Sequence, residues 1–369
     1  MTKILDCFFG KINSLEQRYA RRKYIVKKKA EVVTKLSKVK VHRKLTPAQK
    51  SEIVNFYKYL TGKNISTLDH EYFYSRTGIY TKNYVPMSFF LLDLIGRINR
   101  MDLYKAYSDK NLDDVLLPGV SHPHYYLKNI NGYYYFEGEA VSKEEAISRC
   151  GNLKEVIVKP SLDMQGHGVR KVSFENGVSD FDGHTVGEVF DLYKKDFLIQ
   201  SAVKQHEGMN RLNPTSVNTI RMATYRSGME VLLVYAVVRI GRKGQVIDNQ
   251  SAGGISVKVC PDGTLGKYAF GKSGDDRIEQ TDTGVVLDGY PIPSYEKAVE
   301  TVKKLHYSLP LFDLVGWDIS IDEAGEPVLI EWNGKPGPSQ TACGTGYGEL
   351  TERIIKEVWN RPNTYKQNL

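Results

Sequence analysis

The most regular alternation of hydrophobic and polar residues lies toward the C-terminal end of the chain. Residues 317–322 (WDISID) and 328–333 (VLIEWN) each alternate with a period of two. Because successive side chains of a strand point to opposite faces, this period predicts two strands. The DEAGEP segment between them has the composition of a turn. The pattern therefore predicts a β-hairpin, in which Ile321 faces Val328.

One face of this predicted hairpin carries Asp318, Glu331 and Asn333, with Asp318 opposite Glu331. Opposed residues on one face have Cβ atoms about 5 Å apart, and like charges at that separation are destabilising. Two carboxylates and a carboxamide offer hard oxygen ligands, which suit Mg²⁺ with water and substrate phosphates completing its shell. The pattern favours a Mg²⁺ site over the alternative, a solvated acidic face.

Similar patterns predict further elements along the chain. Asn131-Gly132 separates two short runs rich in tyrosine and is a strong hairpin signal. The predicted strands cover residues 125–130, 133–137, 155–159, 171–174, 197–203, 218–225, 230–240 and 253–259. The predicted helices cover residues 46–61, 142–150, 187–193, 295–305 and 349–359. This mixture of helices and strands predicts the α+β class.

The composition is that of a globular protein with more than one domain. The chain has 369 residues, enough for two or three domains. Its four cysteines lie far apart without a CxxC spacing, which argues against a disulfide framework or a zinc site. No apolar run is as long as a membrane span. We therefore expect a cytoplasmic protein without a transmembrane segment.

The positive charge is concentrated at the N-terminus. The net charge is +8, yet residues 1–50 alone contain fifteen Lys or Arg against three Asp or Glu. We expect a basic helical arm over residues 1–45 and a small N-terminal unit over residues 46–110. A basic amphipathic helix can bind an anionic glycan or lie on the inner face of a membrane. The alternative is a helix that packs one stripe on the body, and nucleic acid is not an expected partner.

Lys159 ends a predicted strand, and a loop containing Gly166-His167-Gly168 follows it. Backbone N–H groups of a glycine-containing loop can approach phosphate oxygens, and a lysine adds a point charge there. The loop is not a Walker A motif, because no GK[ST] follows. The alternative is an ordinary tight hairpin.

Two arginines lie on strands that are otherwise apolar. Arg221 and Arg239 are costly at such positions unless they meet an anion. The alternative is a strand-edge arginine in a structural ion pair. The glycine-rich loop at residues 248–254 can close on a substrate, or be a simple turn. The candidate substrate-binding residues are Asn218, Arg221, Arg239, Asn249, Ser251, Gly253 and Gly254.

The order of these features is more specific than any one of them. Between residues 109 and 359 the chain contains, in this order, Asp109-Lys110, a VKP strand end, GxGV, a strand arginine, a GG loop, and then Asp and ExN. This order resembles the ATP-grasp superfamily. The segments LNPTSVNTIRMATY, DNQSAGGI and IEWNGKPG resemble its sugar-transfer-associated branch. The resemblance implies two α+β subdomains that hold ATP between them, here residues 111–203 (small) and 204–369 (large, with the metal site).

The resemblance also implies roles for individual residues. Lys159 and Arg221 would be catalytic, with Arg221 facing the γ-phosphate, and Asp318, Glu331 and Asn333 would hold Mg²⁺. Lys335 would lie beside the reacting carboxylate. The hinge at residues 200–203 would meet the adenine of ATP. Gln200 or Ser201 stands there in place of the glutamate that the family usually has. The residues expected to contact ATP are Lys128, Lys159, Gly166, His167, Gly168, Gln200, Ser201, Ala202, Val203 and Glu207.

The implied activity is that of an ATP- and Mg²⁺-dependent carboxylate–amine ligase acting through an acyl phosphate. We expect it to join an amino acid or amine to a uronic-acid-type carboxylate in capsule or other polysaccharide biosynthesis. Two alternatives remain, a kinase of a sugar or other small molecule on the same fold, and a non-catalytic nucleotide- or glycan-binding module. No Ser-His or Cys-His arrangement indicates a protein nucleophile.

Overall fold

The computed structural model describes residues 2–162, 168–242, 244, 253–272 and 277–365, with side chains from residue 16 onward. The chain forms two compact units. Met1–Asp102 and Gly337–Leu369 form one, which we call the terminal unit, and Leu103–Lys272 and Asp276–Pro336 form the other, the central unit. The finer division expected from the sequence, at residues 45, 110 and 203, stays a prediction.

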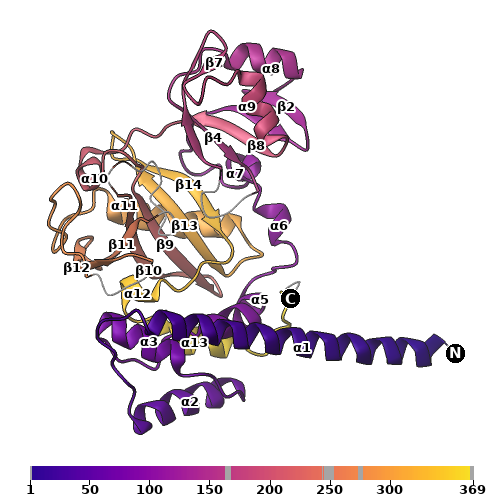
Figure 1. Cartoon of the computed structure of the whole chain (residues 1–369), viewed down its shortest axis with the longest axis vertical. Coiled ribbons are helices and arrows are strands. Elements are labelled where there is room, and N and C mark those ends of the chain that lie inside the picture. The colour runs from indigo at the N-terminus through magenta and orange to yellow at the C-terminus, as the bar shows by residue number, and fades with distance from the viewer. Residues whose placement is uncertain (1, 163–167, 243, 245–252, 273–276, 366–369) are drawn as a thin grey trace. The chain divides into compact units, whose positions relative to one another are not determined.

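The terminal unit is helical. Its helices are α1 (Thr2–Leu36), α2 (Pro47–Thr61), α3 (Leu68–Thr77), α4 (Met87–Phe89), the π-helix η1 (Phe90–Leu94), α5 (Ile95–Ile98), α12 (Gln340–Cys343) and α13 (Leu350–Val358). The basic N-terminal segment is the long helix α1, drawn in indigo in Figure 1. Its last turns bury Val32 and Leu36 against Tyr72 of α3. One stripe of α1 therefore packs within the terminal unit.

Helix α2 begins where its capping residues predict. Thr46 and Gln49 form a capping box, and Pro47 occupies the first turn. Proline is favourable there because the first helical N–H groups have no partner within the helix. The helix ends at Gly62, whose φ of 69° is readily accessible only to glycine.

The central unit contains a large antiparallel sheet. Its strands, in spatial order, are β12 (Leu265–Phe270), β11 (Ile255–Val259), β10 (Glu230–Ile240), β9 (Thr219–Ser227), β13 (Leu314–Ile321) and β14 (Pro327–Asn333). The part of the central unit that contains this sheet, the large-sheet half, also has the helices α10 (Glu207–Leu212) and α11 (Tyr295–Leu305) and the short turn η4 (His306–Ser308). All strand pairs in the sheet are antiparallel. Strand β12 has no counterpart among the strands predicted from the sequence.

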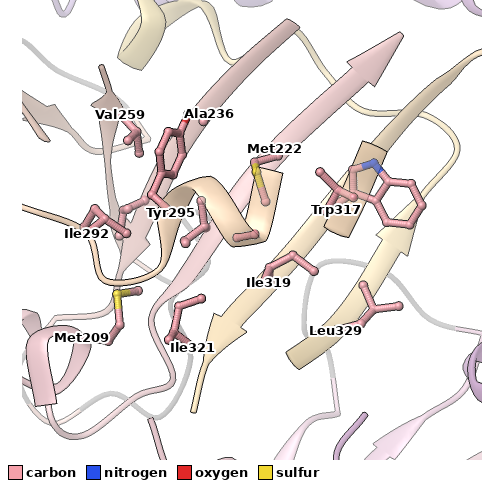
Figure 2. Close-up of a cluster of buried hydrophobic side chains, with 14 of the residues drawn as sticks. Met209, Met222, Ala236, Val259, Ile292, Tyr295, Trp317, Ile319, Ile321 and Leu329 are labelled. Atoms are coloured by element: carbon pink, nitrogen blue, oxygen red, sulfur yellow. The ribbon is translucent and has the colours of Figure 1, made fainter. Parts of the chain in front are cut away.

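The core of this half lies between the sheet and α11. Figure 2 shows Tyr295 near the start of α11, with Met222, Trp317 and Ile319 projecting from the strands. Trp317 is fully buried and donates its Nε1–H to Thr224 Oγ1 at 2.8 Å. A buried aromatic of this size contributes roughly 3 kcal/mol through its apolar area. Trp317 and Trp332, two apolar residues of the predicted hairpin, are both buried in this core.

The predicted hairpin exists, but its register is only partly as predicted. Asp318 pairs with Glu331, as expected. A bulge follows, so that Ser320 rather than Ile321 pairs with Val328, and the predicted Ile321 pairing is wrong. A bulge inserts one extra residue into one strand, which shifts every later pair by one. The two carboxylates nevertheless remain in register.

A second, smaller sheet completes the central unit. Its strands, in spatial order, are β3 (Glu139–Val141), β2 (Tyr133–Phe136), β1 (Tyr125–Ile130), β8 (Phe197–Ser201), β4 (Val156–Pro160) and β5 (Arg170–Val172). A ribbon of β6 (Phe174–Glu175) and β7 (Val178–Ser179) accompanies α8 (Lys143–Cys150) and α9 (Val186–Tyr193). Short helical turns precede the sheet, namely α6 (Tyr104–Tyr107), η2 (Lys110–Leu112) and α7 (Asp113–Leu116). The predicted Asn131-Gly132 turn is confirmed, since Ile130 pairs with Tyr133 and both turn residues have positive φ.

Candidate active site

The large sheet brings one carboxylate and two arginines together. Asp318 of β13 is paired in register with Arg221 of β9. Arg221 donates to both oxygens of Asp318 through Nε and Nη2, and Arg239 of β10 donates from Nη1 at 3.3 Å. Arg221 and Asp318 are both buried. Two guanidinium groups thus share one carboxylate at this buried position.

The contacts within this group fix its charge state. Burial alone lowers the pKa of Arg221, but the neighbouring Asp318 carboxylate outweighs burial and holds that pKa above its usual value. Burial likewise raises the pKa of Asp318, while Arg221 and Arg239 together hold it below its usual range. Arg221 and Asp318 are therefore both charged at neutral pH.

Lysines of the small-sheet half contact carboxylates, and one of these carboxylates belongs to the same hairpin. Lys110 of η2 places Nζ 3.6 Å from Glu331 Oε1 and 3.4 Å from the Ser161 carbonyl oxygen. Lys128 of β1 donates to both oxygens of Asp114, at 2.6 and 2.7 Å. The two sheets of the central unit thus contribute cations and carboxylates to one region.

Lys159 is the least compensated of these cations. Its side chain is buried, with 7% of its surface exposed, and the described residues give its ammonium no ion pair within 4 Å. Burial and the charge of Lys110 together lower the pKa of Lys159 to about 8, against the opposing effect of Glu331 and Asp113. A buried cation without a full partner is costly, and a phosphate oxygen would offset that cost.

Asp113 is a buried acid that sequence reasoning missed. Burial raises its pKa to about 7, against the opposing charges of Lys159 and Lys110. Lys110 was noticed in the sequence only as part of the Asp109-Lys110 pair. The helical turn η2, which carries Lys110, contacts β1 and β8, and no local pattern signals these contacts. Tyr104 was missed for the same reason, and its hydroxyl donates to Asn333 Oδ1 at 3.3 Å.

The three residues predicted to hold a metal lie on the paired strands β13 and β14. Glu331 and Asn333 are two residues apart on one strand, so they share a face. The carboxylate oxygens of Asp318 already accept hydrogen bonds from two arginines. The Glu331 side chain is 31% exposed, and Lys110 is its nearest cation. Within the described ranges, no three His, Cys, Asp or Glu side chains cluster closely enough to bind a metal. The donors fit Mg²⁺ in chemistry, with Glu331 the most accessible of them.

Residues 90–356 match the family described as sugar-transfer associated ATP-grasp.

The chain belongs to this ATP-grasp family.

The family assignment and the two α+β halves of the central unit confirm the fold class expected from the sequence. No curated protein matches the chain.

Several solved structures are similar to this ATP-grasp chain at low sequence identity. An L-amino acid ligase from Bacillus licheniformis is 11% identical, with a TM-score of 0.41, 72% of this chain covered and 50% of that chain. The VanG D-Ala:D-Ser ligase from Enterococcus faecalis is 12% identical, with a TM-score of 0.41 and coverages of 68% and 60%. A D-alanine–D-alanine ligase from Bacillus anthracis, complexed with ATP, is 16% identical, with a TM-score of 0.38 and coverages of 68% and 65%. The matches span half to two thirds of those chains.

The expected adenine hinge lies at the end of β8. Gln200 is buried, and its Oε1 has no hydrogen-bond partner within the described part of the chain. The Ser201 N–H donates to the His124 carbonyl at 2.8 Å, and the Ala202 N–H donates to the Glu155 carbonyl at 3.2 Å. Those two N–H groups are thus engaged within the protein. The unpartnered Gln200 carboxamide oxygen remains able to accept a hydrogen bond from a ligand.

The phosphate-covering loop is described only at its end. Gly166 and His167 lie outside the described residues, and so do Asn249 and Ser251 of the second glycine-containing loop. Gly168 has a φ of 73°, and a Cβ there would lie 3.0 Å from Pro160 Cγ. The Tyr193 hydroxyl donates to the Gly168 carbonyl at 2.6 Å, which anchors this end of the loop. Only glycine fits this anchored position.

The remaining predicted residues have contacts of their own. Glu207 begins α10, is exposed, and accepts from Arg211 at 2.6 Å. Asn218 is buried and donates Nδ2 to the carbonyls of Met209 and Asn213, each at 2.8 Å. Gly253 and Gly254 precede β11, and the Lys335 N–H donates to Asn333 Oδ1 at 2.7 Å. Asn218 therefore helps hold the segment before β9, and Lys335 helps orient Asn333.

Proposed function

We propose that this protein is an ATP-dependent carboxylate–amine ligase. The observation that carries the proposal is the buried, undercompensated cation Lys159, together with the Arg221–Asp318–Arg239 group and the carboxylate of Glu331. Positive charge beside hard oxygen donors suits a triphosphate and its divalent cation. ATP and Mg²⁺ are accordingly the proposed cosubstrate and cofactor.

The proposed reaction has two steps. A carboxylate oxygen of the first substrate attacks the γ-phosphorus of ATP, the bond to the bridging oxygen breaks, and ADP leaves with that electron pair. The amine of the second substrate then attacks the carbonyl carbon of the acyl phosphate. Inorganic phosphate leaves with its electron pair, the amine loses a proton, and an amide remains. No protein nucleophile is required.

The basic residues would act on the charge that moves in the first step. Arg221, already aligned by Asp318, would face the γ-phosphate, and Lys159 would contact the phosphates from β4. Both groups are buried, where electrostatic stabilisation of a transition state is stronger than in water. Lys128, residues 166–168, the hinge residues 200–203 and Glu207 are the further proposed ATP contacts.

Asp318, Glu331 and Asn333 would hold Mg²⁺. The ion would neutralise phosphate charge and polarise the transferred group. Asp318 would exchange one arginine contact for the metal, because its two oxygens are occupied by Arg221 and Arg239.

The proposed substrates are an amino acid or amine and a uronic-acid-type carboxylate, in capsule or other polysaccharide biosynthesis. The family description associates these proteins with sugar transfer, which supports a glycan acceptor. Arg239, Asn218, Lys335 and the loop residues 249–254 are the proposed substrate contacts. We place the protein in the cytoplasm, with the basic helix α1 contacting an anionic glycan or the inner face of a membrane. None of the described helices is long and apolar enough to span a membrane.

The decisive experiment is a substrate screen for ADP release that crosses uronic-acid sugars with free amino acids. We expect ADP only when a carboxylate and an amine are both present, and an amide product in the mass spectrum. A stable phosphorylated product formed without any amine would contradict the ligase. ATP binding without turnover of any substrate pair would instead favour a non-catalytic module.

One observation favours a kinase as the second candidate. Burial raises the pKa of Asp113 to about 7, against the opposing charge of Lys159. A base with that pKa can accept a proton from a hydroxyl nucleophile at neutral pH. The same product analysis separates the candidates, because a kinase yields a phosphate ester and no amide.

A further inference from the structure

The terminal unit contains a cavity of about 300 Å³ that no part of the proposed ligase reaction uses. Three segments line it, namely the middle of α1, the loop after α2 at residues 63–66, and residues 86–93 with the π-helix η1. A cavity of this size is at the small end of those that hold organic ligands. The segments are distant in sequence, so the cavity is a product of the tertiary fold.

A buried carboxylate lies at the wall of the cavity. Asp93 belongs to η1 and is 5% exposed. Arg21 of α1 donates from Nη2 to Asp93 Oδ2 at 2.6 Å, and Lys63 donates to Asp93 Oδ1. Arg21 also donates from Nη1 to the Leu92 carbonyl at 3.5 Å. Asp93 therefore holds two cations at the cavity surface in fixed positions.

Other groups restrict the motion of these cations. The Lys63 ammonium lies 5.3 Å from the centre of the Trp359 ring, and that ring stacks on Phe89. The Leu92 carbonyl also accepts from Asn363 Nδ2 at 2.9 Å. A ligand that met this surface would therefore order few additional side chains, which lowers the entropic cost of binding. Single-turn π-helices such as η1 are frequent at functional sites.

The charge of the cavity selects the sign of its ligand. Arg21, Lys29 and Lys63 line it together with the single carboxylate of Asp93, which leaves two positive charges in surplus. The described residues provide Lys29 with no ion pair. A metal cation would meet this surplus charge and an Asp93 whose oxygens are already engaged. An anion would be attracted, and charge-assisted hydrogen bonds would hold it.

The rest of the lining indicates a ligand with an organic body. Asn64, Ser66 and Ser88 add polar groups, and Ile25, Ile65 and Phe89 add apolar surface. This combination matches a compact molecule that carries one phosphate or carboxylate and presents both hydroxyl groups and carbon surface. A simple inorganic ion would leave the apolar wall unused.

We propose that the terminal unit binds a small organic anion, a phosphate or carboxylate, in the cavity between α1, the loop at residues 63–66 and η1. The site is formed by other segments of the sequence, and belongs to a different compact unit, than the proposed ATP site. It gives the N-terminal basic helix a specific ligand-binding role beside the charge attraction proposed above. Its existence does not depend on the proposed ligase activity.

The test is calorimetric titration of the full-length protein with glucose 6-phosphate, with glucuronate, and with inorganic phosphate. The variant is Lys29→Ala, because Lys29 lines the cavity and holds no partner that its loss would strand. Its matched control is Lys27→Ala, an exposed lysine of the same helix that does not line the cavity. We expect Lys29→Ala to weaken binding about tenfold, the effect of one charge-assisted contact, and Lys27→Ala to leave binding within about twofold.

Each outcome decides the proposal. Binding of the sugar phosphate or of the uronate, weakened by Lys29→Ala alone, supports it, and the stronger ligand identifies the anionic group. Absence of binding by every probe up to about 10 mM would overturn it. Equal losses in Lys29→Ala and Lys27→Ala would also overturn it, because they would indicate general charge attraction. The variant Lys159→Ala should bind these probes normally, which separates this site from a failure of the ligase proposal.

Discussion

Arg221 and Asp318 face each other across the neighbouring strands β9 and β13 and form a two-point ion pair inside the central unit. The residues are 97 positions apart in sequence. Their pairing aligns the guanidinium before any ligand binds, and Arg239 adds a second cation to the same carboxylate. A pre-aligned cation of this kind stabilises developing charge without reorganising.

Removing the charge of Asp318 should destabilise the fold. Asp318→Asn removes the carboxylate that pairs with the buried Arg221 and also contacts the half-buried Arg239, and we expect the free energy of unfolding to fall by about 3 kcal/mol. Urea denaturation of the purified variant measures the loss. The matched control is Asp313→Asn, which weakens the more exposed pair with Arg226 and should cost about 1 kcal/mol. Equal losses in the two variants would contradict the central role of the Asp318 group.

Lys159 should matter more for ATP than for stability. Its buried ammonium is poorly compensated, so Lys159→Met should leave the free energy of unfolding unchanged or raise it. The same change should lower the rate of ADP release about 100-fold, by removing a phosphate contact. Lys171→Met, on the exposed face of β5, is the control and should retain full activity. A strongly destabilised Lys159→Met protein would show that the lysine is structural.

The same lysine predicts a pH dependence. The folded-state pKa of Lys159 is about 8, below its value of 10.5 in an unfolded chain. Between these values the unfolded state binds more protons, so the free energy of unfolding should rise as pH increases from 8 to 10.5. The kcat/KM for ATP should fall over the same range as the free enzyme loses the charge. Stability and activity measured across this range in wild type and Lys159→Met test both signs.

His306 should make the protein sensitive to acid. It is fully buried, its Nδ1 accepts from the Thr224 hydroxyl, and its Nε2–H donates to the Phe312 carbonyl. Burial lowers the pKa of His306 to about 4. The unfolded state therefore binds more protons between pH 6.5 and 4, and stability should fall by about 3 kcal/mol as pH decreases through that window. In His306→Gln, unfolding measurements at several pH values should show a shallower fall, and an unchanged slope would refute the assignment.

Glu331 should set the requirement for Mg²⁺. Its half-buried carboxylate is the most accessible predicted ligand, so Glu331→Gln should raise the Mg²⁺ concentration for half-maximal ADP release about tenfold. The fold should be little affected, because Lys110 is 3.6 Å away and the pair is partly exposed. Glu326→Gln, next to the hairpin turn and paired with Lys297, is the control. The idea fails if both variants show the same Mg²⁺ dependence as the wild type.

Local sequence patterns predicted the parts of this protein that short-range geometry dictates. The period of two from Trp317 to Asn333 predicted the hairpin, and its turn placed Asp318 opposite Glu331. The Asn131-Gly132 turn and the Thr46 cap were predicted for the same reason. In each case the residues that interact are close in the chain, so their preferences act directly on the structure. The order of motifs also identified the family and its α+β class.

The tertiary structure decided the contacts on which the candidate site depends. A bulge after Asp318 shifted the hairpin register, which depends on packing and not on alternation. The pairing of β9 with β13 placed Arg221 against Asp318, although their separation along the chain gave no sign of it. The burial of Lys110 and Asp113 beside Lys159 likewise had no local signal. A sequence determines which charges exist, but burial determines which of them lose water and must find a partner, and burial depends on the whole fold.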